Sequence, residues 1–405
     1  MMTTSKINRC RLLLLLALIL LGGIFAFNFK FPSRPAAYAV SGQPAPWNLH
    51  ALLQESWDFY KGRFLVDGQH VVSNTYGGTI SEGQSYALLK SLWMNDPQTF
   101  RRVWNWTKGH MKRPHDHLLG WRWGDGQFGT RQGLMESENA ADADQDIAYA
   151  LLLAGEKWHN PSYTEDGLNI VKDLWRLNVQ RVDGKYYLVP GTWEGFRQEY
   201  LSLDPSYMAP YVYRQFARFD EEHAMGWTQL ADDTYGTLEA CTALTKPQLP
   251  PNWCAVTWQT KPGNPSRIIF SDRQGAGSRD FSYDAFRVYW RMAMDSKLSP
   301  SPGRERALAY LKNHPFLLNY WQSHHVMPEG FTANGEPRGT ETSGFAMGPV
   351  LVLNHVLPST AGRVTDGELY HQTLALHYRA EGYWFNDYND FLHSVIWLHL
   401  YALSL

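Results

Sequence analysis

The 405-residue chain has little cysteine and no surplus of charge of either sign. Its three cysteines are too few for a disulfide-dense scaffold. Lys and Arg total 37 against 39 Asp and Glu, a net charge of -2, so no basic field exists to hold a polyanion. We therefore exclude nucleic acid as a partner. With 44% hydrophobic and 19% charged residues, intrinsic disorder is excluded as well.

The sequence also lacks motifs that hold phosphates, dinucleotides or metals. There is no P-loop, no Gly-x-Ser-x-Gly elbow and no dinucleotide fingerprint. The acidic run that begins at Asp142 fails as a calcium loop, because the positions that need glycine and an acid hold Ile147 and Leu153. His115 and His117 have no further ligands at metal-site spacing. We expect neither a metal nor an organic cofactor.

Aromatic residues, by contrast, are abundant. The chain holds 17 Trp, 22 Tyr and 19 Phe, together 14% of its residues. Flat, amphipathic side chains in this number suit either a large core or a long groove that stacks a flat ligand. Composition alone leaves both interpretations open.

The first forty residues predict export. Lys6, Arg9 and Arg11 precede an apolar run, Leu12–Phe27, which is the layout of a secretory signal. Ala37-Tyr38-Ala39 then offers small residues at the positions that a signal peptidase reads. The apolar run is shorter than the roughly twenty residues of a comfortable transmembrane helix. We expect a periplasmic or extracellular protein, with an uncleaved membrane anchor as the alternative to cleavage.

The rest of the chain shows no boundary between domains. Residues 1–39 form the expected signal peptide or anchor, 40–46 a short linker, and 47–405 one domain without low-complexity segments or charge blocks. In an oxidising compartment, Cys241 and Cys254 predict a disulfide, worth about 3 kcal/mol for a loop near this length. Two free buried thiols are the alternative.

Helical periodicity recurs throughout this domain. Apolar residues at three- and four-residue steps predict helices over Leu49–Phe59, Glu82–Met94, Pro97–His110, Asp142–Trp158, Gly167–Leu177, Tyr283–Met294, Arg304–Tyr320 and Phe391–Leu403. Strand-like alternation is scarce, and Tyr186–Val189 is the best short candidate. We expect an all-α fold, and a helical toroid fits this length better than a four-helix bundle.

Three acids stand at expected helix starts. Ser81 and Gln84 form a capping-box pattern around Glu82, Asp142 opens a second helix, and Ser282 precedes Asp284 as the N-cap of a third. Acids at these positions stabilise the helix dipole by roughly 0.3–1 kcal/mol, which is the structural explanation. If alternate helices of a toroid run in the same direction, however, all three acids meet at one end of the ring.

Three motifs around these acids resemble glycoside hydrolase family 8. The stretch Ala140–Trp158 follows the family's signature, departing at Ala141, where the family usually has a hydroxyl residue. Ser81–Leu88 and Ser282–Trp290 resemble its other two acidic motifs. Three further motifs recur in the same order, namely Trp121–Gly124, Asp204–Pro210 and Ser343–Pro349. The resemblance implies an (α/α)6 toroid and is greatest to bacterial endoglucanases that accompany cellulose synthesis.

The resemblance also implies roles for these residues. Glu82 is expected to be the general acid and Asp284 the general base of an inverting hydrolysis, with Asp142 binding the sugar at the cleavage site. Arg287 is expected to hold Asp284 ionised, with an ordinary surface ion pair as the alternative. The other substrate-binding candidates are Trp121, Trp123 and Tyr207 as sugar platforms, and Tyr283, which could orient the attacking water. For each Trp, a place in the core is the alternative.

The expected function is that of a monomeric endo-β-1,4-glucanase acting on a β-glucan. The acids do not distinguish it from a xylanase, lichenase or chitosanase on the same fold. A non-catalytic, exported glycan-binding or assembly factor is the alternative from another class, although both Glu82 and Asp284 are present. Partnership with a cellulose synthase complex stays open.

Overall fold

The computed structural model describes residues 47–73, 75–126, 131–194, 200–259, 267–273, 278–339, 343–357 and 364–405. These belong to one compact unit that begins at Pro46. The expected signal peptide or anchor over 1–39 and the linker over 40–46 lie outside the described residues. Within the described residues, no helix has the length and apolar character needed to cross a membrane.

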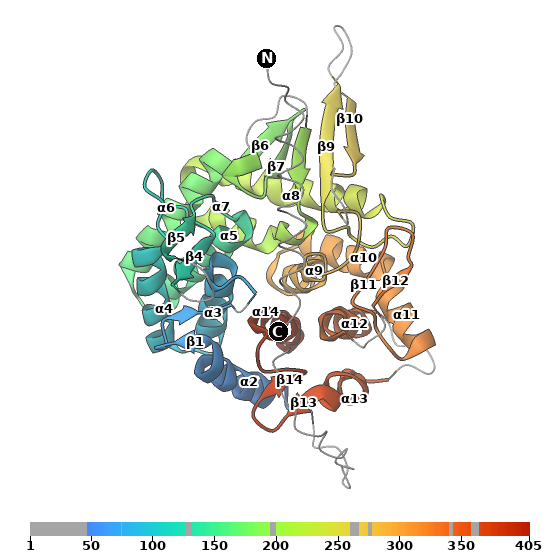
Figure 1. Cartoon of the computed structure of the whole chain (residues 1–405). Coiled ribbons are helices and arrows are strands. Elements are labelled where there is room, and N and C mark those ends of the chain that lie inside the picture. The colour runs from blue at the N-terminus through green and yellow to red at the C-terminus, as the bar shows by residue number, and fades with distance from the viewer. Residues whose placement is uncertain are drawn as a thin grey trace, which may run out of the picture. The chain divides into compact units, whose positions relative to one another are not determined.

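Six helices form an inner ring. They are α3 (Ser81–Trp93), α5 (Ala141–Lys157), α7 (Pro210–Phe219), α9 (Arg287–Leu298), α12 (Gly344–Val356) and α14 (Asp390–Ser404). Each contacts the next in this order, and α14 closes the ring by contacting α3. Figure 1 shows α9, α12 and α14 end-on near the centre.

An outer layer of helices packs against this ring. It comprises α2 (Leu49–Phe64), α4 (Pro97–His110), α6 (Pro161–Asn178), α8 (Ala224–Thr242), α10 (Gly303–Asn313) with α11 (Phe316–His324), and α13 (Asp366–Gln372). Outer and inner helices alternate along the chain, so successive inner helices run in the same direction. The fold is therefore the (α/α)6 toroid that the sequence predicts.

The two layers differ in how their residues are buried. In α5 every side chain from Ala141 to Leu152 is buried, as expected for a helix surrounded by protein. The outer helix α6 buries one stripe, including Tyr163, Ile170 and Leu174, and leaves its other face polar. The inner helices are therefore surrounded by protein, whereas the outer helices expose one face to solvent.

Local signals place several helix boundaries. Asp96 caps α4 by accepting from the Thr99 N–H, and Pro97 occupies the first helical turn, where its missing N–H costs nothing. The prediction for Pro97–His110 is confirmed at both ends. The single helix predicted over Arg304–Tyr320 is wrong, because His314 and Pro315 separate α10 from α11. Pro315 cannot continue the preceding helix.

Short strands connect the helices, more of them than the sequence predicts. Two three-stranded sheets have the order β3-β4-β5 and β10-β9-β8, and all their pairs are antiparallel. Their strands are β3 (Gly78–Ile80), β4 (Arg122–Asp125), β5 (Gln132–Glu136), β8 (Tyr200–Leu203), β9 (Cys254–Gln259) and β10 (Arg267–Ser271). The remaining strands pair in twos: β1 (Leu65–Val66) with β2 (His70–Val71), β6 (Val179–Val182) with β7 (Lys185–Leu188), β11 (Gly330–Phe331) with β12 (Pro337–Arg338), and β13 (Tyr378–Arg379) with β14 (Tyr383–Trp384).

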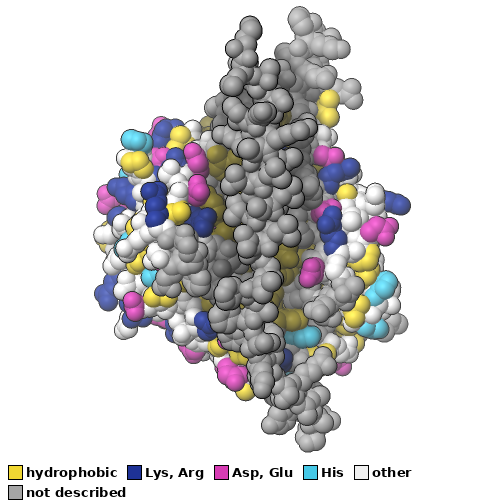
Figure 2. All heavy atoms as spheres, viewed as in Figure 1, with side chains coloured by type: hydrophobic (Ala, Val, Ile, Leu, Met, Phe, Trp, Pro, Cys, Tyr) yellow, Lys and Arg dark blue, Asp and Glu magenta, His cyan; other side chains and the backbone are white. Residues whose placement is uncertain are grey.

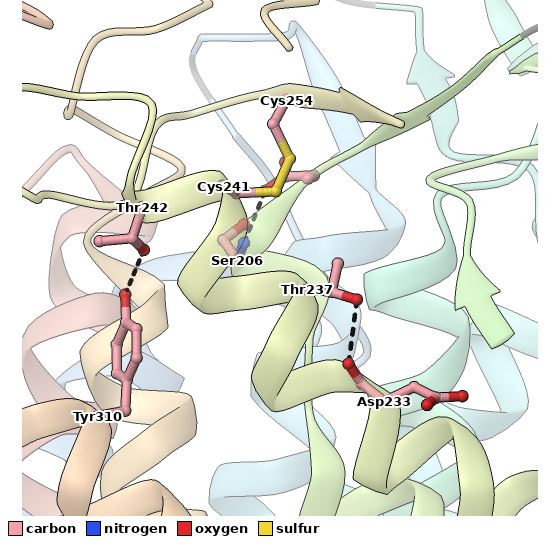
Figure 3. Close-up of a disulfide and its surroundings, with 8 residues drawn as sticks. Ser206, Asp233, Thr237, Cys241, Thr242, Cys254 and Tyr310 are labelled. Atoms are coloured by element: carbon pink, nitrogen blue, oxygen red, sulfur yellow. Dashed lines mark hydrogen bonds between the residues drawn. A yellow bond between two sulfur atoms is a disulfide. The ribbon is translucent and has the colours of Figure 1, made fainter. Parts of the chain in front are cut away.

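A disulfide joins the last turn of α8 to the first residue of β9 (Figure 3). Both partners, Cys241 and Cys254, are fully buried. On the next residue of α8, the Thr242 hydroxyl hydrogen-bonds the Tyr310 hydroxyl of α10 at 2.9 Å. The end of α8 is thus tied both to the neighbouring outer helix and to the sheet.

The charged surface agrees with the near-neutral composition. On the face seen in Figure 2, basic and acidic side chains are interspersed over the coloured surface. Surfaces that track a polyanion instead gather basic side chains into a patch or stripe. The coloured part of this face shows no basic patch of that kind.

A buried ion pair between α5 and α9 gives a test of the packing. Asp146 and Arg291 are at most 1% exposed and form two parallel bonds of 2.5 and 2.8 Å. Arg291→Met should destabilise the protein by about 3–5 kcal/mol in urea unfolding, because it leaves a buried carboxylate without its cation. The double variant D146L/R291M should recover most of this loss. A single variant as stable as wild type would contradict the assignment.

Candidate active site

A cleft of about 340 Å³ opens where α3, α5 and α9 begin. Glu82 and Asp142 lie in the first turns of α3 and α5, and Asp284 lies in the turn before α9. The cleft also has aromatic walls, made by Tyr76, Trp121, Trp193, Tyr207 and Trp253. Carboxylates and aromatic rings together suit a ligand that has both hydroxyl groups and flat apolar faces.

Arg287, in the first turn of α9, joins the acids. Its Nη1 donates to Glu82 Oε2 and to Asp142 Oδ2, both at 2.7 Å, and its Nη2 donates to Asp284 Oδ1 at 3.0 Å. A fourth acid, Asp204, has its Oδ2 3.9 Å from Nη2. The Arg287 side chain is only 1% exposed. The surface ion pair considered for Arg287 is therefore wrong, since the group is buried among acids from four segments of the chain.

The N-cap predicted for α3 is wrong. Ile80, in extended conformation, is the N-cap residue and Ser81 is already helical, without a side-chain cap. The Ser81 N–H pairs with the Trp121 carbonyl at 2.9 Å, because β3 runs directly into the helix beside β4. Gln84 does not reach back to the cap. Its Oε1 accepts from the Val71 N–H at 2.7 Å and its Nε2 donates to Thr107 Oγ1 at 2.6 Å.

The helix predicted over Tyr283–Met294, with Ser282 as its N-cap, is also displaced. The α9 helix begins at Arg287, and residues Ser282–Phe286 form a turn before it. Asn252 holds this turn, since its Oδ1 accepts from the N–H groups of Ser282 and Ala285 at 3.1 and 3.3 Å. Asp284 therefore stands on a turn, and it lines the cleft together with the Trp253 side chain.

Burial and charge raise the pKa values of Glu82, Asp284 and Asp204. Burial raises the pKa of Glu82 to about 8, with Arg287 opposing the rise and Asp142 and Asp284 adding to it. Burial likewise raises the pKa of Asp284, while Arg287 and the Trp253 side chain favour its ionised form. The pKa of Asp204 is raised well above its usual value, by burial first and by Asp284 second. One guanidinium cannot neutralise four carboxylates, so Glu82 carries a proton at neutral pH.

Three of the five substrate-binding candidates line the cleft, and two do not. Trp121, Tyr207 and Arg287 line the cleft beside the acids. Trp123 does not, and the register of β4 shifts between Arg122 and Trp123. Its ring instead meets Trp106 and His110 edge-on and lines a separate pocket. Tyr283 is 51% exposed, packs on Phe345 and lines another pocket with Asn252.

Sequence reasoning overlooked several residues of the cleft. Asp204 belongs to a motif that the resemblance identified, but it was not singled out. Tyr76 and Trp193 lie in loops without periodicity. Trp253 lies in the segment around the two cysteines, which had no counterpart in the motifs. For Asp204 the motif was the available signal, and for the others only the high aromatic content pointed to the groove.

The described residues include no group of three or more His, Cys, Asp or Glu side chains arranged to hold a metal ion. The acids of the cleft face Arg287, and a metal ion would have to compete with that cation for their oxygens. The chemistry available in the cleft is proton transfer between carboxyl groups and a bound ligand.

The ring of six inner helices, with the acids gathered in a cleft at one end, defines an (α/α)6 toroid. The chain belongs to the glycosyl hydrolases family 8, whose family model matches residues 35–328. An endoglucanase of Pseudomonas fluorescens is 34% identical over 262 residues, which cover 60% of this chain and 61% of that protein. The chain spans about three fifths of the length of the first curated relatives it matches.

Solved structures agree with this assignment. An endo-1,4-D-glucanase from Vibrio fischeri is 26% identical, with a TM-score of 0.68, and the match covers 86% of this chain and 94% of the other. The endo-beta-1,4-glucanase of Acetobacter xylinum has the same fold at 22% identity, with a TM-score of 0.68 over 88% of this chain and all of that chain.

The raised pKa of Glu82 predicts a stabilising substitution. Below the unfolded-state pKa near 4.5, Glu82 is protonated in both states, and stability is lost as pH rises from there through the folded-state pKa of about 8. Because Gln resembles the protonated acid, Glu82→Gln should stabilise the protein by about 2–4 kcal/mol at pH 8 and change little at pH 4.5.

The measurement is urea unfolding of wild type and variant at both pH values. Glu305→Gln is the matched control, because Glu305 also lies in a first helical turn but is exposed. A Glu82→Gln variant whose advantage is the same at both pH values would contradict the raised pKa.

Proposed function

We propose that this protein is an endo-acting β-1,4-glucanase that hydrolyses internal glucosidic bonds with inversion of the anomeric configuration. The observation that carries the proposal is that Glu82 and Asp284 face one cleft and bind opposite ends of the same guanidinium. Membership of the family and relatives named endoglucanase support it further.

In this mechanism Glu82 is the general acid. It protonates the glycosidic oxygen as the bond to the leaving sugar breaks, which requires that it hold a proton near neutral pH. Its raised pKa of about 8 satisfies that requirement. Burial is the main cause, and it outweighs the attraction of Arg287 for the charged form.

Asp284 is the general base. It removes a proton from the water that attacks the anomeric carbon from the opposite face of the sugar, and it must therefore be ionised. Arg287 Nη2 and the Trp253 side chain favour that form. Inverting enzymes keep acid and base roughly 6.5–9.5 Å apart to leave room for the water. A guanidinium between the two carboxyl groups is a suitable spacer.

Asp142 completes the proposed catalytic set by accepting hydrogen bonds from the sugar at the cleavage site. Its Oδ1 already accepts from the Ala143 N–H at 2.8 Å and its Oδ2 from Arg287. These donors fix the carboxylate in one orientation, with remaining lone pairs for a sugar hydroxyl. Trp121 and Tyr207 are the proposed platforms for the apolar faces of neighbouring sugars.

Export and a role beside a cellulose synthase complex belong to the same proposal. The charged and apolar N-terminal segment supports export, and so does the Cys241–Cys254 disulfide, since such bonds persist in oxidising compartments. The link to cellulose synthesis, action as a monomer and preference for cellulose over related glycans rest on the sequence resemblance.

The proposal predicts the activity of two variants. Wild type should rapidly lower the viscosity of carboxymethylcellulose while releasing few reducing ends, and its activity should fall above about pH 8, where Glu82 loses its proton. Glu82→Gln and Asp284→Asn should each lose at least about 100-fold in turnover while remaining folded. Glu305→Gln should retain wild-type turnover.

Xylan, lichenan and chitosan serve as parallel substrates. Activity on one of these without activity on carboxymethylcellulose would keep the mechanism and change the substrate. A folded wild type that hydrolyses none of the four glycans would overturn the proposal and favour a binding or assembly factor.

A further inference from the structure

The turn that carries Asp284 is held from outside by three consecutive residues, Asn252, Trp253 and Cys254, which we call the base clamp. The Asn252 side chain makes three hydrogen bonds to the turn. Besides accepting from Ser282 N and Ala285 N, it donates through Nδ2 to Ser282 Oγ at 2.7 Å. The α9 helix binds the turn through other groups, since the N–H groups of Arg287 and Val288 donate to the Asp284 and Ala285 carbonyls, both at 3.1 Å.

The second residue of the clamp acts on the carboxyl group itself. Trp253 lines the same cleft as Asp284, and its indole N–H, which can only donate, lowers the pKa of Asp284 against the rise that burial causes. The ring is fixed on its other sides. The Arg273 guanidinium carbon lies 4.2 Å from its centroid, and the rings of Trp193 and Tyr207 lie 6.2 and 6.5 Å away.

The third residue ties the clamp to the fold on two sides. Cys254 forms the disulfide with Cys241 of α8 (Figure 3). It is also paired with Leu203 of β8, the residue before Asp204. The backbone of the clamp is anchored as well, since the Asn252 N–H donates to the Asp280 carbonyl at 2.7 Å and the Trp253 N–H to the Ser278 carbonyl at 2.8 Å.

We propose that Asn252 and Trp253 are positioning residues for Asp284 and that the Cys241–Cys254 disulfide holds them in place. This inference rests on the proposed role of Asp284 as the general base. Arg287 binds Asp284 from within the turn's own helix, whereas Trp253 binds it from a different segment. Two donors from independent segments restrain the carboxylate so that its remaining lone pairs point to one water position. The hydrolysis rate then depends on a covalent bond that makes no contact with the substrate.

Trp253→Phe is the direct test, because it keeps a ring in the cleft and removes only the N–H donor. Losing a hydrogen bond to a charged group should lower kcat about tenfold and raise the pKa of Asp284 by about one unit. The low-pH limb of the kcat/KM profile should therefore move to higher pH, while the high-pH limb, set by Glu82, should stay. Trp258→Phe is the matched control, because Trp258 lies in β9, the strand that follows Trp253, and does not line the cleft.

A second readout does not depend on hydrolysis. Ionisation of Asp284 beside the indole should change tryptophan fluorescence, giving a pH transition in wild type and Trp258→Phe that is absent from Trp253→Phe and Asp284→Asn. A low-pH limb in Trp253→Phe that coincides with that of Trp258→Phe, or a fluorescence transition that survives in Trp253→Phe, overturns the inference. A wild type without hydrolase activity defeats the proposed function instead, and the fluorescence titration still decides whether the indole binds Asp284.

The disulfide is tested by the double variant C241S/C254S and by thiol reduction of the folded wild type. Both should lower kcat and move the low-pH limb in the same direction as Trp253→Phe, with a cooperative thermal transition retained. Unchanged kinetics in the reduced wild type, with reduction verified by mass, would overturn the part of the inference that concerns the disulfide.

Discussion

The rest of the structure depends on one buried cation. Arg287 binds acids that lie 205 and 145 residues before it in the sequence, as well as one three residues before it. These acids can meet only if the starts of α3, α5 and α9 converge, which a ring of parallel inner helices provides. The short sheets also help to bring the acids together, since β3 leads directly into α3 and β8 leads into the turn that carries Asp204.

A second buried group of charged residues lies between α5 and α9, and it differs from the group around Arg287 in its charge balance. Asp146 and Arg291 lie one helical turn beyond Asp142 and Arg287, and there one guanidinium binds one carboxylate through two bonds. That group is balanced and has no access to the cleft. At Arg287 the same residue type serves several acids, and the excess negative charge adds to burial in raising the pKa of Glu82. The same excess of negative charge lowers the stability of the fold and keeps the proposed general acid protonated.

The sequence predicted the elements whose signals are local. Asp96 and Pro97 determine the start of α4, and the acids belong to motifs that need no long-range information. It missed α12, where nearly every residue is buried, so that no polar face reveals the helical period. It assigned Trp121 and Trp123 the same role, because both offer an aromatic ring on which a sugar face could stack. The two rings line different pockets, and the register shift between Arg122 and Trp123 cannot be seen in the residue types.

The position of Asp284 could not have been predicted for a related reason. A Ser two residues before an acid is a good helix start by local rules, yet α9 begins only at Arg287. Asn252, about thirty positions away, accepts from the N–H groups of Ser282 and Ala285, which a helix start would leave without a backbone partner. A turn fixed in this way lets the carboxylate point into the cleft rather than along a helix surface. Asp284 is therefore the acid whose position differs most from what local rules predict, and it is also the one whose orientation matters most for the proposed chemistry. The residue that holds its turn, Asn252, belongs to a segment outside the family motifs.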